Sequence, residues 1–169
     1  HRGADQIYLF NFMDGGTIPV STSDYRILIE QGLGPDIATS QPRRHIQAFR
    51  DTVPPGMSNG AKLPVNGRPG GTFNLYIGPA PKTGAATFIA GLAKHEGVES
   101  ATFDAAVNGK PCTPLEDRPE PGQYPGVVRA VQFACPLDAL TDGSNEIRIQ
   151  QHAGQPEQQI VWAEIRIEP

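Results

Sequence analysis

The sequence predicts a mainly β protein: a β-sandwich of the jelly-roll kind, preceded by a single β/α unit. Nineteen glycines and seventeen prolines are spread over 169 residues. They fall between short apolar runs and not inside long ones, which is typical of a chain with many turns. The runs themselves alternate apolar and polar residues and are rich in β-branched and aromatic side chains, as expected of half-buried strands.

The first part of the chain follows a different pattern. Residues 6–12 (QIYLFNF) are a nearly continuous apolar run, which predicts a strand buried on both faces. One amphipathic helix is predicted to begin within residues 21–23 and to end near residues 32–34. One such unit cannot form a domain alone. We therefore expect a β/α segment at 1–42 and a β-sandwich domain at 43–169.

Period-two alternation predicts the strands of the sandwich. The predicted strands span residues 72–77, 87–92, 98–107, 126–135, 145–151 and 159–167. The pair Asn108-Gly109 favours the tight turn of a β-hairpin. In the last strand, alternation places Val161 on the core face and puts Ile160 and Trp162 on the opposite, wetter face.

Composition excludes several classes of function. The formal net charge of -4 gives no reason to bind nucleic acid or an anionic membrane. No apolar run approaches the ~18 residues of a membrane span. Cys112 and Cys135 suit a disulfide between neighbouring strands in an oxidising compartment, so we expect a secreted or periplasmic protein. Two buried free thiols are the alternative.

Several segments resemble the C-terminal region of bacterial glycoside-hydrolase-like proteins. HRGADQIYLFNFMD and TSDYRILIEQGLGPDIAT resemble the last strand and helix of a (β/α)8 barrel. RRHIQAFRDTVPPG, AAVNGKP, LTDGSNEIRI and VWAEIRI resemble strands of the sandwich that follows such barrels. The resemblance implies an accessory domain that packs on a catalytic barrel. An unpaired strand at residues 6–12 would aggregate, so it must pair with the sandwich, with a second copy in a homodimer, or with other sequence.

Carbohydrate-binding sites commonly combine aromatic faces with polar groups around them. The candidate platform is the single tryptophan with two tyrosines and two charged residues: Trp162, Tyr76, Tyr124, Glu164 and Arg166. The alternative is that Trp162 is a core or interface residue and that the tyrosines lie singly on the surface.

Two metal sites are also conceivable. A chain that begins with His1 offers an amine and an imidazole, and resembles in that position the copper monooxygenases that cleave polysaccharides. The second ligand would be His45, His95 or His152. Asp142 and Asn145 suit a structural calcium ion, although turn formation explains the same residues.

Catalytic residues remain unknown, because the sequence contains neither a GxSxG motif nor a recognisable pair of catalytic carboxylates. We therefore expect a non-catalytic accessory or carbohydrate-binding module of a polysaccharide-degrading enzyme, without a cofactor. Its partner would be a polysaccharide or a catalytic barrel domain. The alternatives are a copper-dependent polysaccharide monooxygenase and a structural assembly module.

Overall fold

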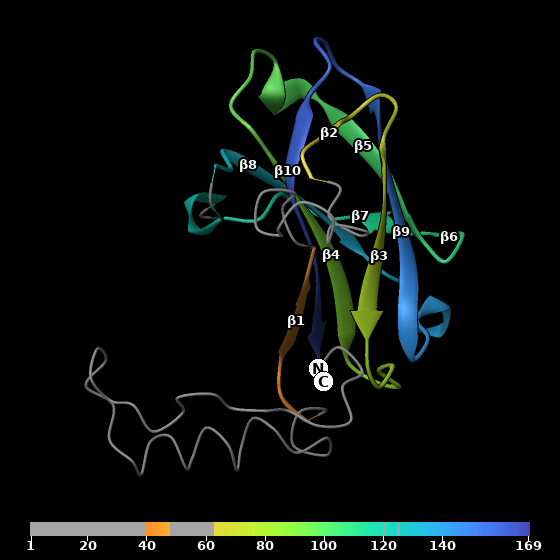
Figure 1. The fold of residues 1–169 in the computed structure, drawn as a ribbon. Coiled ribbons are helices and arrows are strands. Elements are labelled where there is room, and N and C mark those ends of the chain that lie inside the picture. Colours follow the sequence, from red (N-terminus) through yellow and green to blue (C-terminus); the bar gives the residue numbers. More distant parts are fainter. Residues whose placement is uncertain (1–39, 48–62, 120, 125) are drawn as a thin grey trace, which may run out of the picture.

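The computed structural model describes residues 40–47, 63–119, 121–124 and 126–169 (Figure 1). Within these ranges the chain forms strands and short 3-10 turns, and no α-helix. The strand and helix predicted within residues 1–34 lie outside the described ranges.

Two antiparallel sheets form the two layers of a β-sandwich (Figure 1). The first sheet has the order β1-β10-β4-β8-β7, and β2 also pairs with β10. The bounds of these strands are β1 Arg43–Ile46, β2 Val65–Asn66, β4 Ala85–Leu92, β7 Thr113–Pro114, β8 Arg129–Ala134 and β10 Gln159–Glu168. The second sheet has the order β3-β9-β5-β6. Its strands are β3 Gly71–Ile77, β5 Thr102–Val107, β6 Lys110–Pro111 and β9 Gly143–Ala153.

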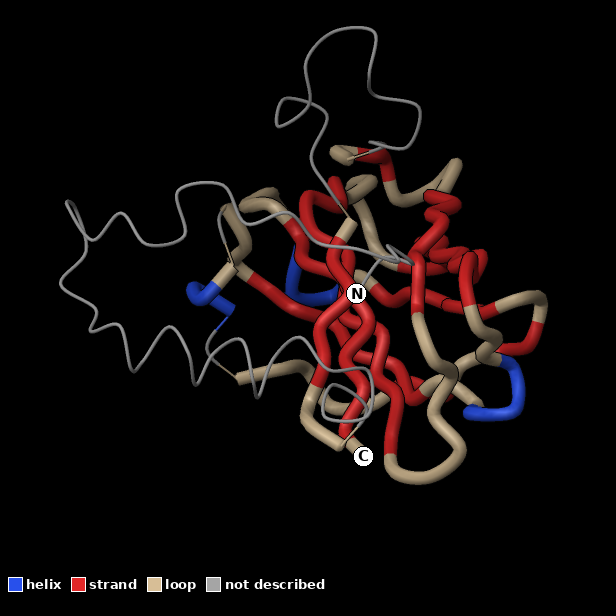
Figure 2. The backbone as a smooth tube through the Cα atoms, turned by 60° about the horizontal axis from the view of Figure 1, so that its bottom comes forward, coloured by secondary structure: helices blue, strands red, loops and turns tan. Residues whose placement is uncertain are grey.

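The β-sandwich prediction is confirmed (Figure 2), and each predicted sandwich strand overlaps an observed one. The largest difference is in the predicted strand 98–107. A 3-10 turn, η2 (Val98–Ser100), follows Gly97 at φ 70°, so β5 starts only at Thr102. Two further 3-10 turns, η3 (Pro121–Gln123) and η4 (Leu137–Ala139), lie in the connections on either side of β8.

The predicted hairpin at Asn108-Gly109 is confirmed. Both residues have positive φ, 47° and 80°, and Val107 pairs with Lys110 across the turn. Two-residue hairpin turns of this kind need left-handed backbone at both positions, which asparagine and glycine adopt most easily.

The main core lies between the inner faces of the sheets. In β3 the buried and exposed residues alternate, as one-sided burial of a strand requires. The largest fully buried apolar side chains in this core are Leu63, Phe73, Ile77, Phe88, Leu92, Ile147, Ile149, Ile160, Ile165 and Ile167.

The predicted facing of β10 is wrong at its start. The register with β4 shifts between Ile160 and Trp162, so Val161 is an extra residue in the ladder. This bulge turns Ile160 into the main core, where its side chain is fully buried, while Val161 contacts the outer face. Simple alternation cannot anticipate the insertion of one residue.

A second apolar cluster covers the outer face of the first sheet. Its buried members are Ile89, Tyr124, Val127 and Ala130, and Val161 and Trp162 pack against them. Tyr124 and Val127 belong to the connection between β7 and β8. That connection therefore closes part of a sheet face that would otherwise be open.

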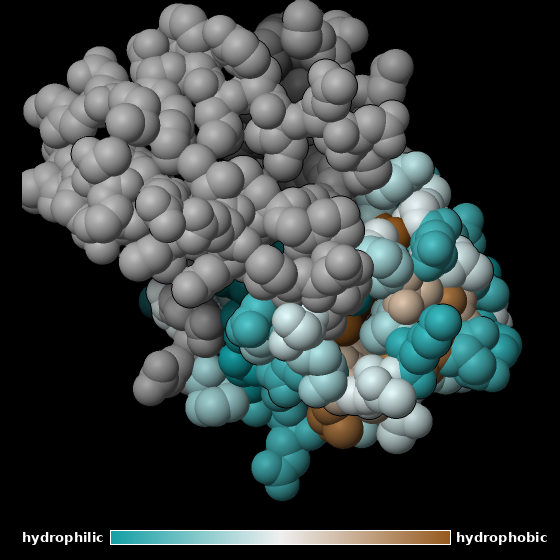
Figure 3. All heavy atoms as spheres, turned by 90° about the horizontal axis from the view of Figure 1, so that it is seen from below, coloured by the Kyte–Doolittle hydropathy of each residue, from teal (hydrophilic) through white to brown (hydrophobic). Residues whose placement is uncertain are grey.

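The exposed surface is mostly polar. In the view of Figure 3 the described part is largely hydrophilic, with small and separate apolar patches. The large exposed apolar side chains in the described ranges are Tyr76, Leu115 and Val128. A helix with the length and apolar character of a membrane span is not found in the described part of the chain.

Candidate functional site

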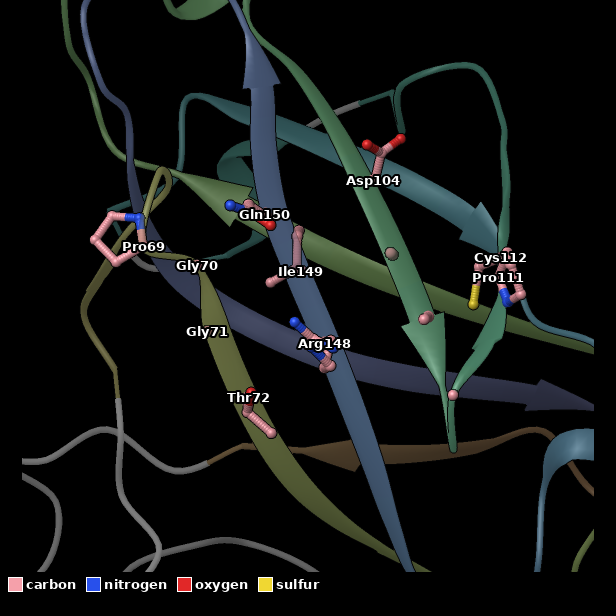
Figure 4. A pocket seen from close by; sticks show the side chains of 13 residues that line it. Pro69, Gly70, Gly71, Thr72, Asp104, Pro111, Cys112, Arg148, Ile149 and Gln150 are labelled. Atoms are coloured by element: carbon pink, nitrogen blue, oxygen red, sulfur yellow. The ribbon is translucent and has the colours of Figure 1, made fainter.

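The clearest concave site is a groove across the outer face of the second sheet (Figure 4). Its volume is about 380 Å³. The lining runs from the β3 edge to the β6 edge, with the central strand β9 between them. Because neighbouring strands lie about 4.8 Å apart, a groove that crosses four strands is roughly 14 Å long.

Register explains which side chains line the groove. Arg148 on β9 lies opposite Thr72 on β3 and opposite Ala106 on β5. Gln150, two residues further along β9, lies opposite Asp104. Residues directly opposite in a sheet share a face, so the long side chains of β9 stand between short ones.

The wall at the β3 end depends on a glycine. Gly70 has φ 77°, and a Cβ atom built there would lie 2.6 Å from the carbonyl oxygen of Ile149. Any larger residue would push the 67–70 turn away from β9. Side-chain bonds hold the same turn in place, because Gln150 Nε2 donates to the Arg68 carbonyl at 2.9 Å and Arg68 Nη2 donates to the Gly154 carbonyl at 2.9 Å.

Arg148 is exposed on the central strand of this sheet. It makes no hydrogen bond or ion pair with any residue in the described ranges. Every other described arginine has such a partner, and these are Arg43, Arg44, Arg68, Arg118, Arg129 and Arg166. Within the described part of the chain, the guanidinium of Arg148 is thus left without a protein partner.

Asp104, on the β5 side of the groove, is held by a histidine. His152 Nδ1 lies 3.1 Å from Asp104 Oδ2, and His152 Nε2 lies 3.0 Å from Thr102 Oγ1. The register of β5 and β9 shifts between Thr102 and Phe103, so His152 is the extra residue of a bulge. The bulge places the imidazole beside two side chains that share the outer face of β5.

A hydroxyl, an imidazole and a carboxylate in this order are also the components of an acyl-transfer triad. Here the His152 and Asp104 side chains are 52% and 75% exposed. Such triads depend on a site that excludes water, where preorganised donors act strongly. The arrangement at the rim of the groove is therefore suited to orienting Asp104 as a hydrogen-bond acceptor.

Four of the five predicted carbohydrate-binding residues do come together, but on the other sheet. Glu164 on β10 is fully buried, and its Oε2 accepts bonds from Arg44 Nη2 at 2.5 Å and Nε at 3.1 Å. Its Oε1 accepts a bond from Arg166 Nε at 2.7 Å and lies 3.4 Å from the Tyr124 hydroxyl. The Tyr124 ring packs on Trp162 with the ring centroids 5.3 Å apart.

This cluster of Arg44, Glu164, Arg166, Tyr124 and Trp162 has the character of a packing centre. Tyr124 is only 1% exposed, so its ring offers no face to a sugar in this structure. Burial, and then the negative charge of Glu164, raise the pKa of the Tyr124 phenol above its ordinary value. Trp162 is itself partly buried and packs against the outer cluster that contains Tyr124.

Tyr76, the fifth predicted residue, is separate from these four. It lies on β3 in the second sheet, is 47% exposed, and faces Ser144 across the ladder. It shares the outer face with the groove residues Thr72 and Arg148 but is absent from the groove lining. The interpretation of a lone surface tyrosine therefore fits Tyr76.

The described histidines do not converge. His45 is buried on β1 opposite Ile165, which is a core residue. His95 is exposed in the loop after β4, and His152 lies on the outer face of the second sheet. His1, the first ligand of the predicted copper site, lies outside the described residues. Groups of three or more potential metal-ligating side chains are not found in the described ranges.

The residues predicted to hold calcium form a turn. Asn145 is fully buried; its amide nitrogen donates to the Thr141 and Gly143 carbonyls, and its oxygen accepts from the Thr141 N–H at 2.9 Å. Asp142 Oδ1 accepts a bond from the Ala80 N–H at 2.6 Å. The Asn145 bonds are those of a turn, whereas the Asp142 bond joins that turn to the loop after β3.

Cys112 and Cys135 lie side by side, as predicted, but are not joined. Their sulfur atoms are 3.6 Å apart, whereas a disulfide bond is about 2.05 Å long. Both are buried thiols, which was the alternative prediction. The hydrogen bond between them lowers the pKa of Cys112 and, together with burial, raises that of Cys135.

Sequence reasoning missed the groove residues Thr72, Asp104, Arg148 and Gln150. The signal in the sequence was the alternation in β9, where polar residues alternate with residues that are apolar or carry a side-chain amide. The outward-facing polar residues are Ser144, Glu146, Arg148, Gln150 and His152. A scan against protein-family models finds no family that matches this chain, and a search of curated proteins finds no matching sequence.

Proposed function

We propose that this protein is a non-catalytic, carbohydrate-binding accessory module of a polysaccharide-degrading enzyme. The observation that carries the proposal is the groove across β3, β9, β5 and β6. It is open, extended and lined by hydrogen-bonding side chains, which suits a chain-like ligand rich in hydroxyl groups. The resemblance of the sequence to the region that follows glycoside-hydrolase barrels supports the same proposal.

The groove presents both donors and acceptors. Arg148 and Thr72 lie in one row across the sheet, and Asp104 and Gln150 lie in the next. Each sugar hydroxyl both donates and accepts hydrogen bonds, so a ligand that lies across these rows finds partners of both kinds. Glycine and alanine lie between the polar residues and leave the space in which a chain can lie.

Secretion and a disulfide between Cys112 and Cys135 belong to the same proposal. A module that acts on polysaccharide outside the cell folds in an oxidising compartment. The two buried sulfurs are close enough that a small side-chain movement would join them.

Blocking the groove tests the proposal. Ala106 lies between Arg148 and Pro111 in the second sheet, so Ala106→Trp would fill the groove. Ser144→Trp is the matched control, because it adds the same ring to an exposed position of β9 that does not line the groove. Calorimetry or affinity electrophoresis with a panel of plant and algal polysaccharides would measure binding.

We expect the unmodified protein and Ser144→Trp to bind at least one polysaccharide, and Ala106→Trp to lose that binding. A protein that binds no polysaccharide in the panel would refute the proposal. Binding that survives Ala106→Trp unchanged would refute the groove as the site. Circular dichroism and thermal melting would verify that both variants are folded.

A further inference from the structure

The groove is unusual for a carbohydrate site because its lining contains no aromatic ring. The lining residues in the described ranges are glycine, alanine, proline, isoleucine, cysteine and four polar residues. Stacking of a sugar on an aromatic face is one of the larger contributions to glycan affinity. Without it, hydrogen bonds and charge must supply most of the binding energy.

Within the described ranges the groove lining carries two charged side chains, Arg148 and Asp104, and Arg148 is the one without a hydrogen bond or ion pair. Arg148 stands at the centre of the sheet between the short side chains of Thr72 and Ala106, so neither neighbour covers its guanidinium. The carboxylates nearby are Glu146 on the same strand and Asp104 on β5, and the imidazole of His152 lies on β9. Asp104 is engaged with His152, and no ion pair joins Arg148 to Glu146 or Asp104.

We infer that the groove selects acidic glycans, and that Arg148 binds their carboxylate or sulfate groups; this rests on the proposed function. A guanidinium offers two parallel N–H donors that match the paired oxygens of such an oxyanion. Asp104 and Gln150, one row away, then accept and donate bonds to the hydroxyl groups of the same sugar or its neighbour. The interaction of Arg148 with the anionic group supplies the binding energy that ring stacking supplies in other carbohydrate sites.

Three ligands of different charge separate the possible outcomes: polygalacturonate as a uronate, a sulfated galactan as a sulfate ester, and an uncharged glucan. The variants are Arg148→Gln, which removes the charge, and Arg148→Lys, which keeps the charge but loses the planar fork. Lys94→Gln is the matched control, because it removes one positive charge from an exposed loop outside the groove.

We expect the unmodified protein to bind at least one of the two acidic glycans, and Arg148→Gln to weaken that binding at least about tenfold. Arg148→Lys should bind the acidic glycan more weakly than the unmodified protein and more tightly than Arg148→Gln. Lys94→Gln should bind as the unmodified protein does. Raising the salt concentration should weaken binding of the acidic glycan. Comparison of polygalacturonate with the sulfated galactan identifies which oxyanion is preferred.

Two results would overturn the inference while leaving the proposed function intact. One is binding of the uncharged glucan with equal or higher affinity than either acidic glycan. The other is acidic-glycan binding that Arg148→Gln leaves unchanged. Failure to bind any of the three, or any member of the wider panel, would instead remove the proposed function itself.

Discussion

The hydroxyl of Tyr124 lies 3.4 Å from Oε1 of Glu164, although the two residues are 40 positions apart in the chain. Arg166 joins the same pair, because its Nε donates to Glu164 at 2.7 Å and its Nη2 donates to the Tyr124 hydroxyl at 3.0 Å. These bonds connect the β7–β8 connection to β10. They hold a polar centre beside the outer apolar cluster of the first sheet.

Removing the charge of Glu164 should destabilise the fold. In Glu164→Gln the guanidinium groups of Arg44 and Arg166 lose the buried carboxylate with which both form ion pairs, so we expect the free energy of unfolding to fall by about 3 kcal/mol. Urea denaturation measures the change. Asp138→Asn is the control, since it breaks the exposed ion pair with Lys110. A loss no larger than that of the control would contradict the prediction.

Tyr124 should make the protein less stable at alkaline pH. Its pKa is raised in the folded state above the ordinary value of 10.0, so the fold holds the phenol proton more tightly than the unfolded chain does. This contribution is fully present below pH 10 and is lost as the pH rises through the raised pKa. Tyr124→Phe should therefore lose less stability than the unmodified protein as the pH rises above about 10.

The measurement for Tyr124 is the free energy of unfolding as a function of pH. Tyr76→Phe, on the exposed face of the other sheet, is the matched control and should follow the unmodified protein. Identical alkaline profiles for Tyr124→Phe and the unmodified protein would refute the assignment.

Gly91 should tolerate no side chain. A Cβ atom at this position of β4 would lie 2.4 Å from Cγ2 of Val127 and 2.8 Å from Cβ of Trp162. Gly91→Ala therefore forces the β7–β8 connection off the sheet, and we expect a loss of about 1–3 kcal/mol in the free energy of unfolding. Gly78→Ala is the control, because a Cβ atom there meets nothing within 4 Å. Thermal melting that ranks the two variants equally would count against this account.

Oxidation should join Cys112 to Cys135. The bond would close a loop between residues 23 positions apart, and we expect it to stabilise the fold by about 3 kcal/mol. Intact mass spectrometry after treatment with glutathione disulfide would detect the loss of two hydrogens, and thermal melting would detect the stabilisation. Cys112→Ser is the control and should show neither effect. An oxidised sample that retains two alkylatable thiols would exclude the bond.

Alternation and turn chemistry were sufficient to predict the sandwich. The strands around Phe73 and Ile147 follow from one-sided burial, and the Asn108-Gly109 turn follows from its need for positive φ. The facing of Val161 was not predictable, because a bulge inserts one residue without a compositional signature.

The candidate site was harder to predict for a different reason. Arg148 is distinguished from the other described arginines by the partners that it lacks, and those partners come from distant parts of the chain. Conversely, Glu164 and Arg166 are of residue types that often form binding sites, but the β7–β8 connection covers them. Long-range contacts decide which polar residues reach the surface, and the residue pattern of a single strand carries no information about those contacts.

The pairing of β1 with β10 has a consequence for how the sandwich can be joined to other polypeptide. Arg43 lies opposite Ile167, so the first and last described strands run antiparallel at one edge of the sheet. A linker from another protein could leave at one strand and return at the other without crossing the fold. The same geometry permits a circular permutant, opened at the exposed hairpin between Asn108 and Gly109, to keep every strand in its place.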